Sequence, residues 1–334
     1  MTLQDVARHA AVSTATVSRF LARPELVREK RRKRIEAAIA DLEYIPHGAA
    51  QALASQKSRA IGAIVPTLDN AIFATGIHAF QKHLQNAGYT LLVASSDYSL
   101  KEECRQGETL IARGIDGMML IGCDHDPQLY ARLQQKKTPY VNTWVYDEAS
   151  PHPCVGFDNF RAAVRQASYL VDIGHKRFGI IVGLTKDNDR ARDRLKGLRQ
   201  ALLERGIAID EEMIYESPYE ISESRQLTRR LLALERPPTG IICGNDVLAY
   251  GAIVECQSCS LRVPEDISVV GFDDLSMSQH IRPALTTIHV PSEEMGRKAA
   301  DYLIARLHGE TVPIHTELEA NLILRGSTAP PRRS

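Results

Sequence analysis

Apolar residues at the start of the chain recur at the three-to-four-residue spacing that places them on one face of a helix. They mark two short helices, at Leu3, Val6, Ala7 and Ala10 and then at Val17, Phe20 and Leu21. Thr2 can cap the first helix, with Asp5 placed to reach back to the exposed amides, and Ser13 can cap the second. The pattern predicts a helix-turn-helix.

The predicted second helix carries short hydroxyl side chains. Ser13, Thr14, Thr16 and Ser18 are followed by Arg19. Such groups fit closely against a phosphate backbone or a base edge, which makes this helix a candidate for contact with DNA. A small amphipathic hairpin that only packs on another surface is the alternative interpretation.

A third helix and a break come next. The segment from Glu29 to Leu42 turns Ile35 and Ala38 inward and would close a three-helix headpiece. Pro46 favours an extended residue before it and ends this region. The segment from His47 to Ala54 is typical of a helix, but it is shorter than the roughly 12 to 15 residues that an isolated helix needs in water. We expect this helix to be frayed unless something orders it, and a plain linker is the alternative.

From Ala60 onward, short apolar runs typical of strands alternate with amphipathic helical stretches. The expected strands are Ile61–Val65, Thr90–Ala94, Gly117–Ile121, Tyr140–Thr143, Cys154–Phe157, Phe178–Val182, Gly240–Cys243, Ile267–Gly271, Thr287–Val290 and a last one near Leu318–Leu324. The expected helices beyond Cys154 are Phe160–Ile173, Arg190–Arg205, Ser222–Leu234, Val247–Cys256 and Glu293–His308. Continuous apolar strands between amphipathic helices indicate parallel sheets covered on both faces, here in two successive α/β lobes.

The N-terminal stretches strongly resemble the LacI/GalR family of bacterial transcription repressors. The family motifs TLxDVAxxAxVSxxTVSRxL and LxYxPNxxAxxL match TLQDVARHAAVSTATVSRFL and LEYIPHGAAQAL at nearly every fixed position. The resemblance implies an α/β fold, with a helix-turn-helix headpiece and a two-lobed, periplasmic-binding-protein-like core of parallel sheets. The implied domains are a DNA-binding headpiece over 1–45, a hinge helix and linker over 46–59, and an effector-binding and dimerisation core over 60–327, with lobe 1 at about 60–157 and 288–327 and lobe 2 at about 158–287.

The resemblance also assigns roles in DNA binding. Thr14, Ala15 and Arg19 match the positions that read bases, and Arg19 can pair with guanine. Leu53 matches the hinge-helix leucine that is wedged between base pairs in the minor groove. The implied DNA-binding residues are Thr2, Ser13, Thr14, Ala15, Thr16, Ser18, Arg19, Tyr44, His47, Ala50 and Leu53.

Three residues depart from the family pattern in this region. Ala11 stands where many members have Gly in the turn, a modest strain if the residue is left-handed. His47 replaces the Asn that caps the hinge helix, and Gly48 lowers helicity further. We therefore expect hinge folding to depend steeply on dimerisation and on the operator sequence.

Candidate effector-binding residues follow the carboxyl ends of predicted strands, where open α/β sheets bind ligands. Arg194 matches a family arginine that grips hydroxyls or a carboxylate, and Asn245 and Asp273 match an amide and a carboxylate that bind hydroxyls. Trp144 offers an indole face to a sugar ring, and it follows Thr143 where many members have a carboxylate. The expected effector-binding residues are Thr67, Asp69, Phe73, Trp144, Arg194, Asn245 and Asp273; Asn159, Asp246 and Asp274 are expected to cap helices.

The charge distribution agrees with a nucleic-acid surface at the N-terminus. Residues 1–60 hold 11 Lys and Arg against 6 Asp and Glu, and the rest holds 30 against 35, so an overall net charge of zero conceals a basic N-terminal region. No signal peptide and no apolar run of about 18 residues is visible, which favours a cytoplasmic protein with no membrane partner. The six cysteines lie scattered in apolar segments and are expected to be reduced, buried thiols.

Motifs for catalysis are missing. The sequence contains no GxxxxGK[ST], GxGxxG, GxSxG or HExxH, and Cys256 and Cys259 have the spacing of only half a zinc site. We expect no catalytic residue, no metal and no cofactor. A solute receptor or sugar-metabolising enzyme with the same two lobes is the rival class, but a receptor needs an export signal and an enzyme needs a nucleophile, a base or a cofactor loop.

The leading interpretation is a ligand-responsive, sequence-specific DNA-binding repressor. A homodimer would place two recognition helices in successive major grooves of a near-palindromic double-stranded operator, about 34 to 36 Å apart. Arg194 and its hydroxyl-type partners favour a monosaccharide or a sugar acid as the small-molecule effector. The stretch from Val155 to Asn159 is similar to gluconate-type repressors within the family.

Overall fold

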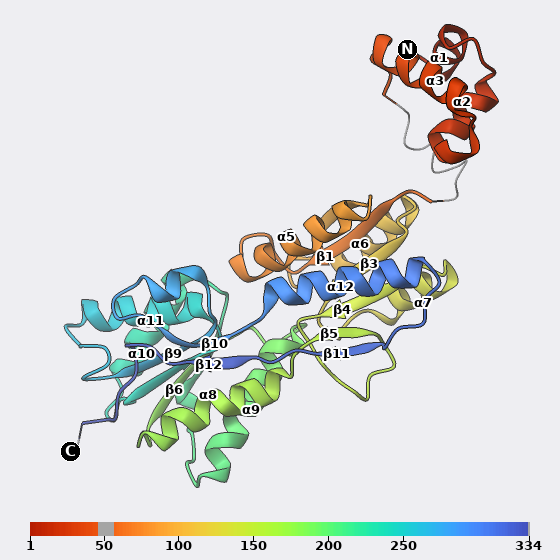
Figure 1. The fold of residues 1–334 in the computed structure, drawn as a ribbon. Helices are drawn as coiled ribbons and strands as arrows, with labels where there is room; N and C mark the ends of the chain where they lie inside the picture. The colour runs from red at the N-terminus through yellow and green to blue at the C-terminus, as the bar shows by residue number, and fades with distance from the viewer. Residues whose placement is uncertain (46–56, 333–334) are drawn as a thin grey trace.

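The computed structural model describes residues 1–45 and 57–332, which form a three-helix headpiece and a core of two α/β lobes (Figure 1). In these two ranges no helix is long and apolar enough to cross a membrane. The expected hinge helix, with His47, Ala50 and Leu53, lies outside the described residues.

Three helices form the headpiece, as the apolar spacing predicts. They are α1 (Leu3–His9), α2 (Thr14–Ala22) and α3 (Glu29–Asp41), with a short 3-10 turn η1 at Pro24–Leu26. Val6, Val17 and Ile35 have no exposed surface and form the centre of a small apolar core. This core fixes the angle between α1 and α2 because each helix contributes only one apolar face to it.

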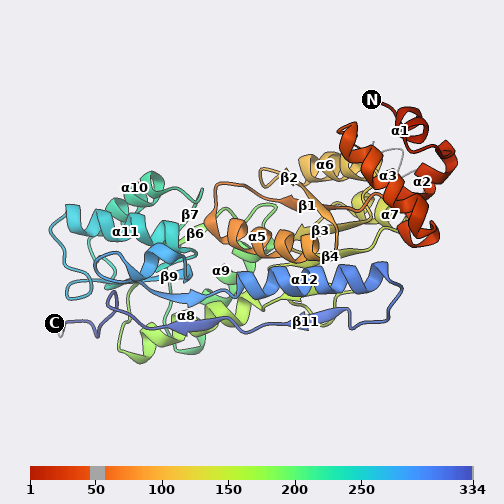
Figure 2. The same ribbon diagram turned by 45° about the horizontal axis from the view of Figure 1, so that its top comes forward.

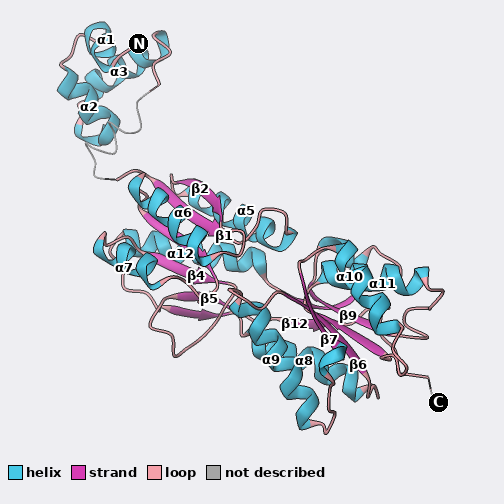
Figure 3. Cartoon of the chain, turned by 180° about the vertical axis from the view of Figure 1, so that it is seen from behind, coloured by secondary structure: helices cyan, strands magenta, loops and turns pink. Residues whose placement is uncertain are grey.

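Lobe 1 is built on a six-stranded sheet with the order β11-β5-β4-β3-β1-β2 (Figure 3). Its strands are β1 (Ala60–Val65), β2 (Thr90–Ser95), β3 (Gly117–Ile121), β4 (Tyr140–Thr143), β5 (Cys154–Gly156) and β11 (His315–Glu317), and its helices are α5 (Ala71–Asn86), α6 (Leu100–Ala112), α7 (Pro127–Gln135) and α12 (Ser292–Leu307). All five residues of β3 are buried, as expected for a parallel strand covered on both faces.

Lobe 2 repeats this plan with the order β12-β10-β9-β8-β6-β7. Its strands are β6 (Phe178–Gly183), β7 (Ile214–Ser217), β8 (Gly240–Cys243), β9 (Ser268–Asp273), β10 (Thr286–His289) and β12 (Asn321–Ile323); its helices are α8 (Asn159–Asp172), α9 (Asp189–Glu204), α10 (Ile221–Leu232) and α11 (Asp246–Ser258), with 3-10 turns η2 (Glu211–Met213) and η3 (Ser276–Gln279). In both lobes the strand order reverses beside the first strand. Ligands of such sheets bind at this reversal, beyond the carboxyl ends of the strands.

The chain crosses between the lobes three times. It passes from β5 to α8, from β10 to α12, and from β11 to β12. Helix α12 returns to lobe 1 and lies beside α5, and β11 runs along the far edge of the same lobe (Figure 2). These connections restrict the lobes to motion about the crossing strands, in the manner of a hinge.

The end of the chain differs from the expected division into lobes. Residues 288–327 were expected in lobe 1, but β12 pairs with β10 in the lobe 2 sheet and Ser327 accepts the backbone N–H of Val269 through its carbonyl. The strand expected near Leu318–Leu324 is β12 in the lobe 2 sheet, and β11, which precedes it in the lobe 1 sheet, was not expected. The apolar pattern missed β11 and β7 because both are edge strands with exposed or half-buried polar residues.

Candidate functional site

Loops that follow the carboxyl ends of strands in both lobes meet in a cleft with two adjoining chambers. The inner chamber is lined by Asn70, Ile72, Phe73, Tyr98, Trp144, Asn188, Arg190, Arg194, Tyr219, Asn245 and Asp273. The outer chamber is lined by Thr67, Asp69, Asn70, Asp97, Tyr98, Leu184, Asn188, Ser217, Pro218, Tyr219, Glu220 and Val247. All seven expected effector-binding residues therefore lie in the cleft, five in the inner chamber and two in the outer.

Arg194 is held rigidly at the base of the inner chamber. Its Nε donates to Oδ1 of Asn159 at 2.8 Å, and its Nη1 donates to the carbonyl of Gly244 at 2.8 Å. The guanidinium lies 3.7 Å from the centre of the Phe272 ring, a cation-π contact. Nη1 is also 3.8 Å from Oδ1 of Asp273. Because these contacts fix its planar guanidinium group, Arg194 is suited to bind a ligand with oxygen acceptors.

Asp273 faces Arg194 with its carboxyl group fully buried. Burial raises the pKa of Asp273 to about 8, although the nearby Arg194 acts in the opposite direction. The residue has a φ of +119°, a strained conformation for a side chain of this kind, which aims its carboxyl into the cleft. At neutral pH most Asp273 carboxyls are therefore protonated and can donate a hydrogen bond.

Three buried polar atoms of the inner chamber have no hydrogen-bond partner: the hydroxyl of Tyr98, Nε1 of Trp144 and Nδ2 of Asn245. Trp144 is 1% exposed, and its ring packs edge-on against Phe73 at 5.4 Å between centroids. Burial raises the pKa of the Tyr98 hydroxyl well above its usual range, so it stays protonated. Because buried donors without a partner cost free energy, all three mark a place for ligand atoms.

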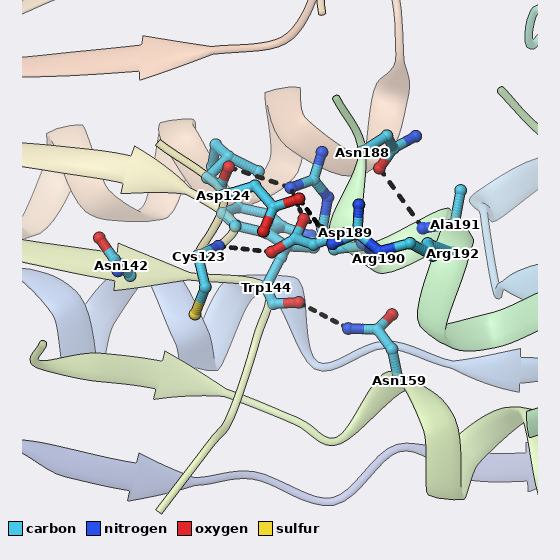
Figure 4. Close-up of polar contacts among 12 residues, drawn as sticks. Cys123, Asp124, Asn142, Trp144, Asn159, Asn188, Asp189, Arg190, Ala191 and Arg192 are labelled. Atoms are coloured by element: carbon cyan, nitrogen blue, oxygen red, sulfur yellow. Dashed lines mark hydrogen bonds and ion pairs between the residues drawn. The ribbon is translucent and has the colours of Figure 1, made fainter. Parts of the chain in front are cut away.

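An interlobe clamp joins the two lobes beside this chamber (Figure 4). It is formed by Asp189, Arg190 and Arg192 of α9 against residues 121–124, the end of β3 and the loop that follows it in lobe 1. Asp189 accepts the backbone N–H of Cys123 at 2.5 Å, Arg190 donates to the carbonyl of Ile121 at 3.0 Å, and Arg192 pairs with Asp124 at 2.5 Å. These contacts hold the two lobes together beside the inner chamber.

Gly122 lies at the centre of the clamp. Its φ is +100°, and a Cβ at this position would overlap Nη1 of Arg190. His125 fixes the glycine from behind, since one ring nitrogen is 2.9 Å from the Gly122 carbonyl and the other is 2.7 Å from the Glu103 carboxylate. Only glycine allows the lobes to approach this closely.

Three predicted helix caps have other roles. Asp246 does not cap α11; its buried carboxylate accepts from Leu275 N, Ser278 Oγ and Thr287 Oγ1, at 2.7, 2.6 and 2.5 Å. The cap is Asn245, whose Oδ1 accepts from Leu248 N at 2.9 Å, so this residue is both cap and cleft donor. The prediction for Asp246 was wrong because Asn245 and Asp246 are adjacent and both are favoured at an N-cap, so the sequence pattern does not show which of them caps α11.

Asn159 and Asp274 also differ from the prediction. Asn159 lies inside α8, where it donates to the Trp144 carbonyl at 2.9 Å and accepts from Arg194, and thus links the lobes. Asp274 pairs with Arg325 and His289 at 2.6 and 3.0 Å. The cysteines are all free, but two of them are not buried as expected: Cys259 is exposed and Cys123 is half-buried.

The sequence analysis missed several cleft residues. Asn188 and Arg190 follow β6 in the stretch Asn-Asp-Arg-Ala, and their position after a strand was a usable signal. Tyr98 follows the edge strand β2, which was predicted to end at Ala94, one residue before its last residue Ser95. Tyr219 could not be found in this way because it follows β7, a strand that the apolar pattern does not mark.

In the headpiece, the caps predicted for α1 and α2 are confirmed. Thr2 and Asp5 form a reciprocal capping box, and Ser13 accepts the N–H of Thr16 at 3.2 Å. Ala11 in the turn has a φ of 47°, the left-handed conformation anticipated for it, and its carbonyl accepts from Arg34 at 3.2 Å.

The outer face of α2 is exposed. Thr14, Ala15 and Arg19 lie in solvent, while Thr16 and Ser18 are half-buried beside them. Tyr44, expected at phosphate, is only 9% exposed and packs into the headpiece core. The arrangement presents base-contacting side-chain types on a helix whose opposite face is buried, as helix-turn-helix proteins do.

Comparison with known proteins matches residues 2–47 to the family described as bacterial regulatory proteins, lacI family, and residues 167–328 to a periplasmic binding protein-like domain. The HTH-type transcriptional repressor CytR of Escherichia coli is 34% identical over 98% of this chain and 96% of its own length. The HTH-type transcriptional regulator GntR of E. coli is 34% identical over 93% of both chains. The Lac repressor dimer bound to operator and the anti-inducer ONPF superposes with a TM-score of 0.87 and 28% identity, over 98% of this chain and 99% of that one.

Proposed function

The chain belongs to the lacI family of bacterial regulatory proteins and is a ligand-responsive, DNA-binding transcriptional repressor; we propose that it acts in the cytoplasm as a homodimer on a near-palindromic operator. A monosaccharide or sugar acid bound in the cleft would change the angle between the lobes and so control operator affinity. A coupling of about 1 to 3 kcal/mol between the two sites would suffice for regulation.

The observation that carries the DNA-binding part is the exposed row on α2. Arg19 is the side chain best suited to pair with guanine, and Thr14 and Ala15 precede it by about one helical turn. Thr2, Ser13, Thr16 and Ser18 supply hydroxyls for phosphate oxygens. His47, Ala50 and Leu53 complete the proposal in the hinge, where pairing of two copies on DNA would wedge Leu53 into the minor groove.

The cleft supports the effector part. Arg194, Asn245 and Asp273 converge from three elements of lobe 2, facing Phe73 and Trp144 of lobe 1. Polar groups on one wall and aromatic faces on the other suit a hydroxylated compound with an apolar side. A related solved structure is described as the regulator CelR in complex with cellobiose, which agrees with a carbohydrate-type ligand.

Selection of binding sequences from random DNA by the full-length protein tests the DNA-binding part. We expect a near-palindromic consensus, and we expect Arg19→Ala to weaken binding at least tenfold, since a bidentate contact to a base contributes about 1 to 3 kcal/mol. Arg306→Ala, which removes an exposed arginine from α12, is the control for charge alone. Failure to enrich any sequence contradicts the proposal.

Removing residues 1–58 separates the two parts. Retention on DNA should fall with rising salt for the whole chain and disappear for the shortened one, while effector binding persists. A thermal-shift screen against sugars and sugar acids finds the effector, because a ligand at 100 times its Kd stabilises the core by about 2.7 kcal/mol. An effector that leaves operator affinity unchanged would remove the regulatory claim.

A further inference from the structure

We infer that the effector is a sugar acid bound with its carboxylate in the inner chamber and its uncharged, hydroxylated body in the outer chamber. The inference rests on the proposed function, and it goes beyond that function by choosing between a neutral sugar and a sugar acid and by fixing the orientation of the ligand.

Size is the first reason. The inner chamber leaves about 20 Å³ for the centres of water molecules, which is room for one or two waters. A carboxylate has this size, whereas a sugar ring or a phosphate group is larger. The outer chamber offers about 390 Å³ on the same basis, ample for a hydroxylated ring or chain. Ring and acceptor group must therefore occupy different chambers.

The second reason is that the unused groups of the inner chamber are donors. The Trp144 indole and the Asn245 amide nitrogen have no acceptor, and both residues are 1% exposed. The Tyr98 hydroxyl, at the junction of the two chambers, is likewise unpaired. Indole and amide nitrogens cannot accept a hydrogen bond, so the ligand group between them must supply acceptor oxygens. A carboxylate supplies two oxygens and four lone-pair sites.

Charge is the third reason. Of the two arginines in the inner chamber, Arg190 is neutralised by Asp189 at 2.7 Å. Arg194 faces only Asp273, at the longer distance of 3.8 Å, and burial keeps that carboxyl largely protonated at neutral pH because it raises the pKa of Asp273 to about 8. The chamber thus has close to one unit of positive charge to offer an anion. Bringing a neutral hydroxyl there would leave this charge unbalanced.

The outer chamber has the opposite character. Asp69, Asp97 and Glu220 line it, and none of its lining residues is a lysine, arginine or histidine. No ion pair within residues 1–45 and 57–332 involves these three carboxylates. Together with Thr67 and Ser217 they accept hydrogen bonds from hydroxyl groups, and they repel a second anionic group. The ligand body in this chamber is therefore polyhydroxylated and uncharged.

The tyrosines divide the two chambers. Tyr98 from lobe 1 and Tyr219 from lobe 2 line both, with ring centroids 6.1 Å apart. Their rings flank the passage through which the carboxylate must enter. A sugar acid carries its carboxylate on a terminal carbon, which lets the acid group pass between the rings while the hydroxylated carbons remain outside.

Calorimetric titration of the full-length protein tests the inference with matched probes: gluconate and glucuronate, the neutral compounds glucose and sorbitol, glucose 6-phosphate, and acetate. We expect at least one sugar acid to bind about 100-fold more tightly than the neutral compound of the same carbon skeleton, and acetate to bind weakly. Operator retention is measured in parallel on the same samples.

Two variants probe the inner chamber. Asn245→Asp keeps an oxygen to cap α11 but replaces the Nδ2 donor with a second oxygen, and it should weaken sugar-acid binding at least 100-fold. Trp144→Phe removes the Nε1 donor and should weaken it about tenfold. Asn86→Asp, at the exposed end of α5, controls for adding a carboxylate and should change nothing.

The alternative outcomes are distinct. A neutral sugar that binds as tightly as its acid, or a sugar phosphate that binds better, overturns this inference and leaves the proposed function standing. Acetate that binds as tightly as the sugar acid overturns the role of the outer chamber. If no probe binds while the operator is retained, the inference and the proposed effector class both fail, and the DNA-binding proposal survives.

Discussion

The two lobes share one strand order but contribute different chemistry to the cleft. Lobe 2 supplies the buried ionisable groups Arg194 and Asp273 from α9 and β9, whereas lobe 1 supplies the aromatic side chains Phe73 and Trp144. Each set follows the carboxyl ends of parallel strands near the point where the strand order reverses. The same topology therefore gives a polar wall and an aromatic wall, depending only on the loop residues.

The two lobes also differ in how many ionisable side chains they bury. Lobe 2 holds Arg194, Asp246 and Asp273 with almost no exposed surface, and Arg194 and Asp246 are each held by several partners of their own lobe. The aromatic side chains of lobe 1 need only close packing and, for Trp144, an acceptor for the Nε1 hydrogen. We expect substitutions on the polar wall to affect folding and binding together, and those on the aromatic wall to affect mainly binding.

The largest expected effect is that of Arg194→Met. It leaves the side-chain oxygen of Asn159 and the carbonyl of Gly244 buried without their donor, and should lower the free energy of unfolding by about 2 to 5 kcal/mol. Trp144→Phe in lobe 1 should cost about 1 kcal/mol or less, since most of the ring is kept. Denaturant unfolding of both variants measures the contrast. Equal losses would contradict the proposed division between the walls.

Gly122→Ala should have the next largest effect, because Gly122 lies where the two lobes meet and contacts Arg190 of the opposite lobe. An alanine there must keep a strained, positive φ, and its methyl group displaces Arg190. Together these effects should lower the free energy of unfolding by about 2 to 4 kcal/mol. Small-angle scattering should show an opened cleft. Gly114→Ala, with a φ of +76° and no atom within 4 Å of its Cβ, is the matched control and should cost about 1 kcal/mol without opening the cleft.

Stability should fall as pH rises, owing to the polar wall. Burial raises the pKa of Asp273 to about 8 and that of Asp246 to about 6, while both are near 4 in an unfolded chain. Between pH 4 and each raised pKa the folded protein binds more protons than the unfolded chain. Its free energy of unfolding therefore decreases as pH rises, by at most about 1.4 kcal/mol per pH unit for each group.

Asp273→Asn separates the two contributions. It should remove the fall in melting temperature between pH 6 and pH 8 and roughly halve the fall between pH 4 and pH 6, leaving the part that belongs to Asp246. Thermal melts at pH 5, 6, 7 and 8 measure this. A variant whose melting temperature falls between pH 6 and pH 8 as steeply as that of the wild type is incompatible with the assignment.

The smallest expected effect concerns the outer edge of the clamp. Arg192 and Asp124 are each more than a third exposed, so their pair should contribute only about 0.2 to 1 kcal/mol. Arg192→Asp should weaken closure slightly, and the double exchange with Asp124→Arg should restore it. A double-mutant cycle on effector affinity measures the coupling, and a coupling above about 2 kcal/mol would show that this pair, rather than Asp189 and Gly122, holds the lobes together.

Much of the fold was predictable because the buried strands are continuous apolar runs. The ends of Gly117–Ile121, Tyr140–Thr143 and Gly240–Cys243 are those of β3, β4 and β8. The two edge strands β7 and β11 were not predictable from apolar spacing, since β7 contains only one aliphatic residue and β11 contains none. The exchange of the last strands between lobes depends on long-range pairing, of which the local sequence gives no sign.

The candidate site was predictable where a residue lies just after a marked strand. Arg194, Asn245 and Asp273 were found because their motifs resemble those of the family. The interlobe clamp was not found, because Asp189 and Cys123 are 66 positions apart and one of the two groups is a backbone amide. The unpaired Nε1 donor of Trp144 could not be predicted either, because the sequence does not show where the indole nitrogen points.

The order in which the chain emerges from the ribosome gives the exchanged strands a further consequence. Lobe 1 lacks α12 and β11, and lobe 2 lacks β12, until residues beyond 290 have been synthesised. The headpiece, complete within the first 45 residues, can fold long before either lobe. A chain cut short after β9 would thus carry a folded DNA-binding unit on two unfinished lobes with exposed apolar faces. We expect limited proteolysis to cleave such a fragment within the lobes faster than it cleaves the full-length chain, and to leave the headpiece intact.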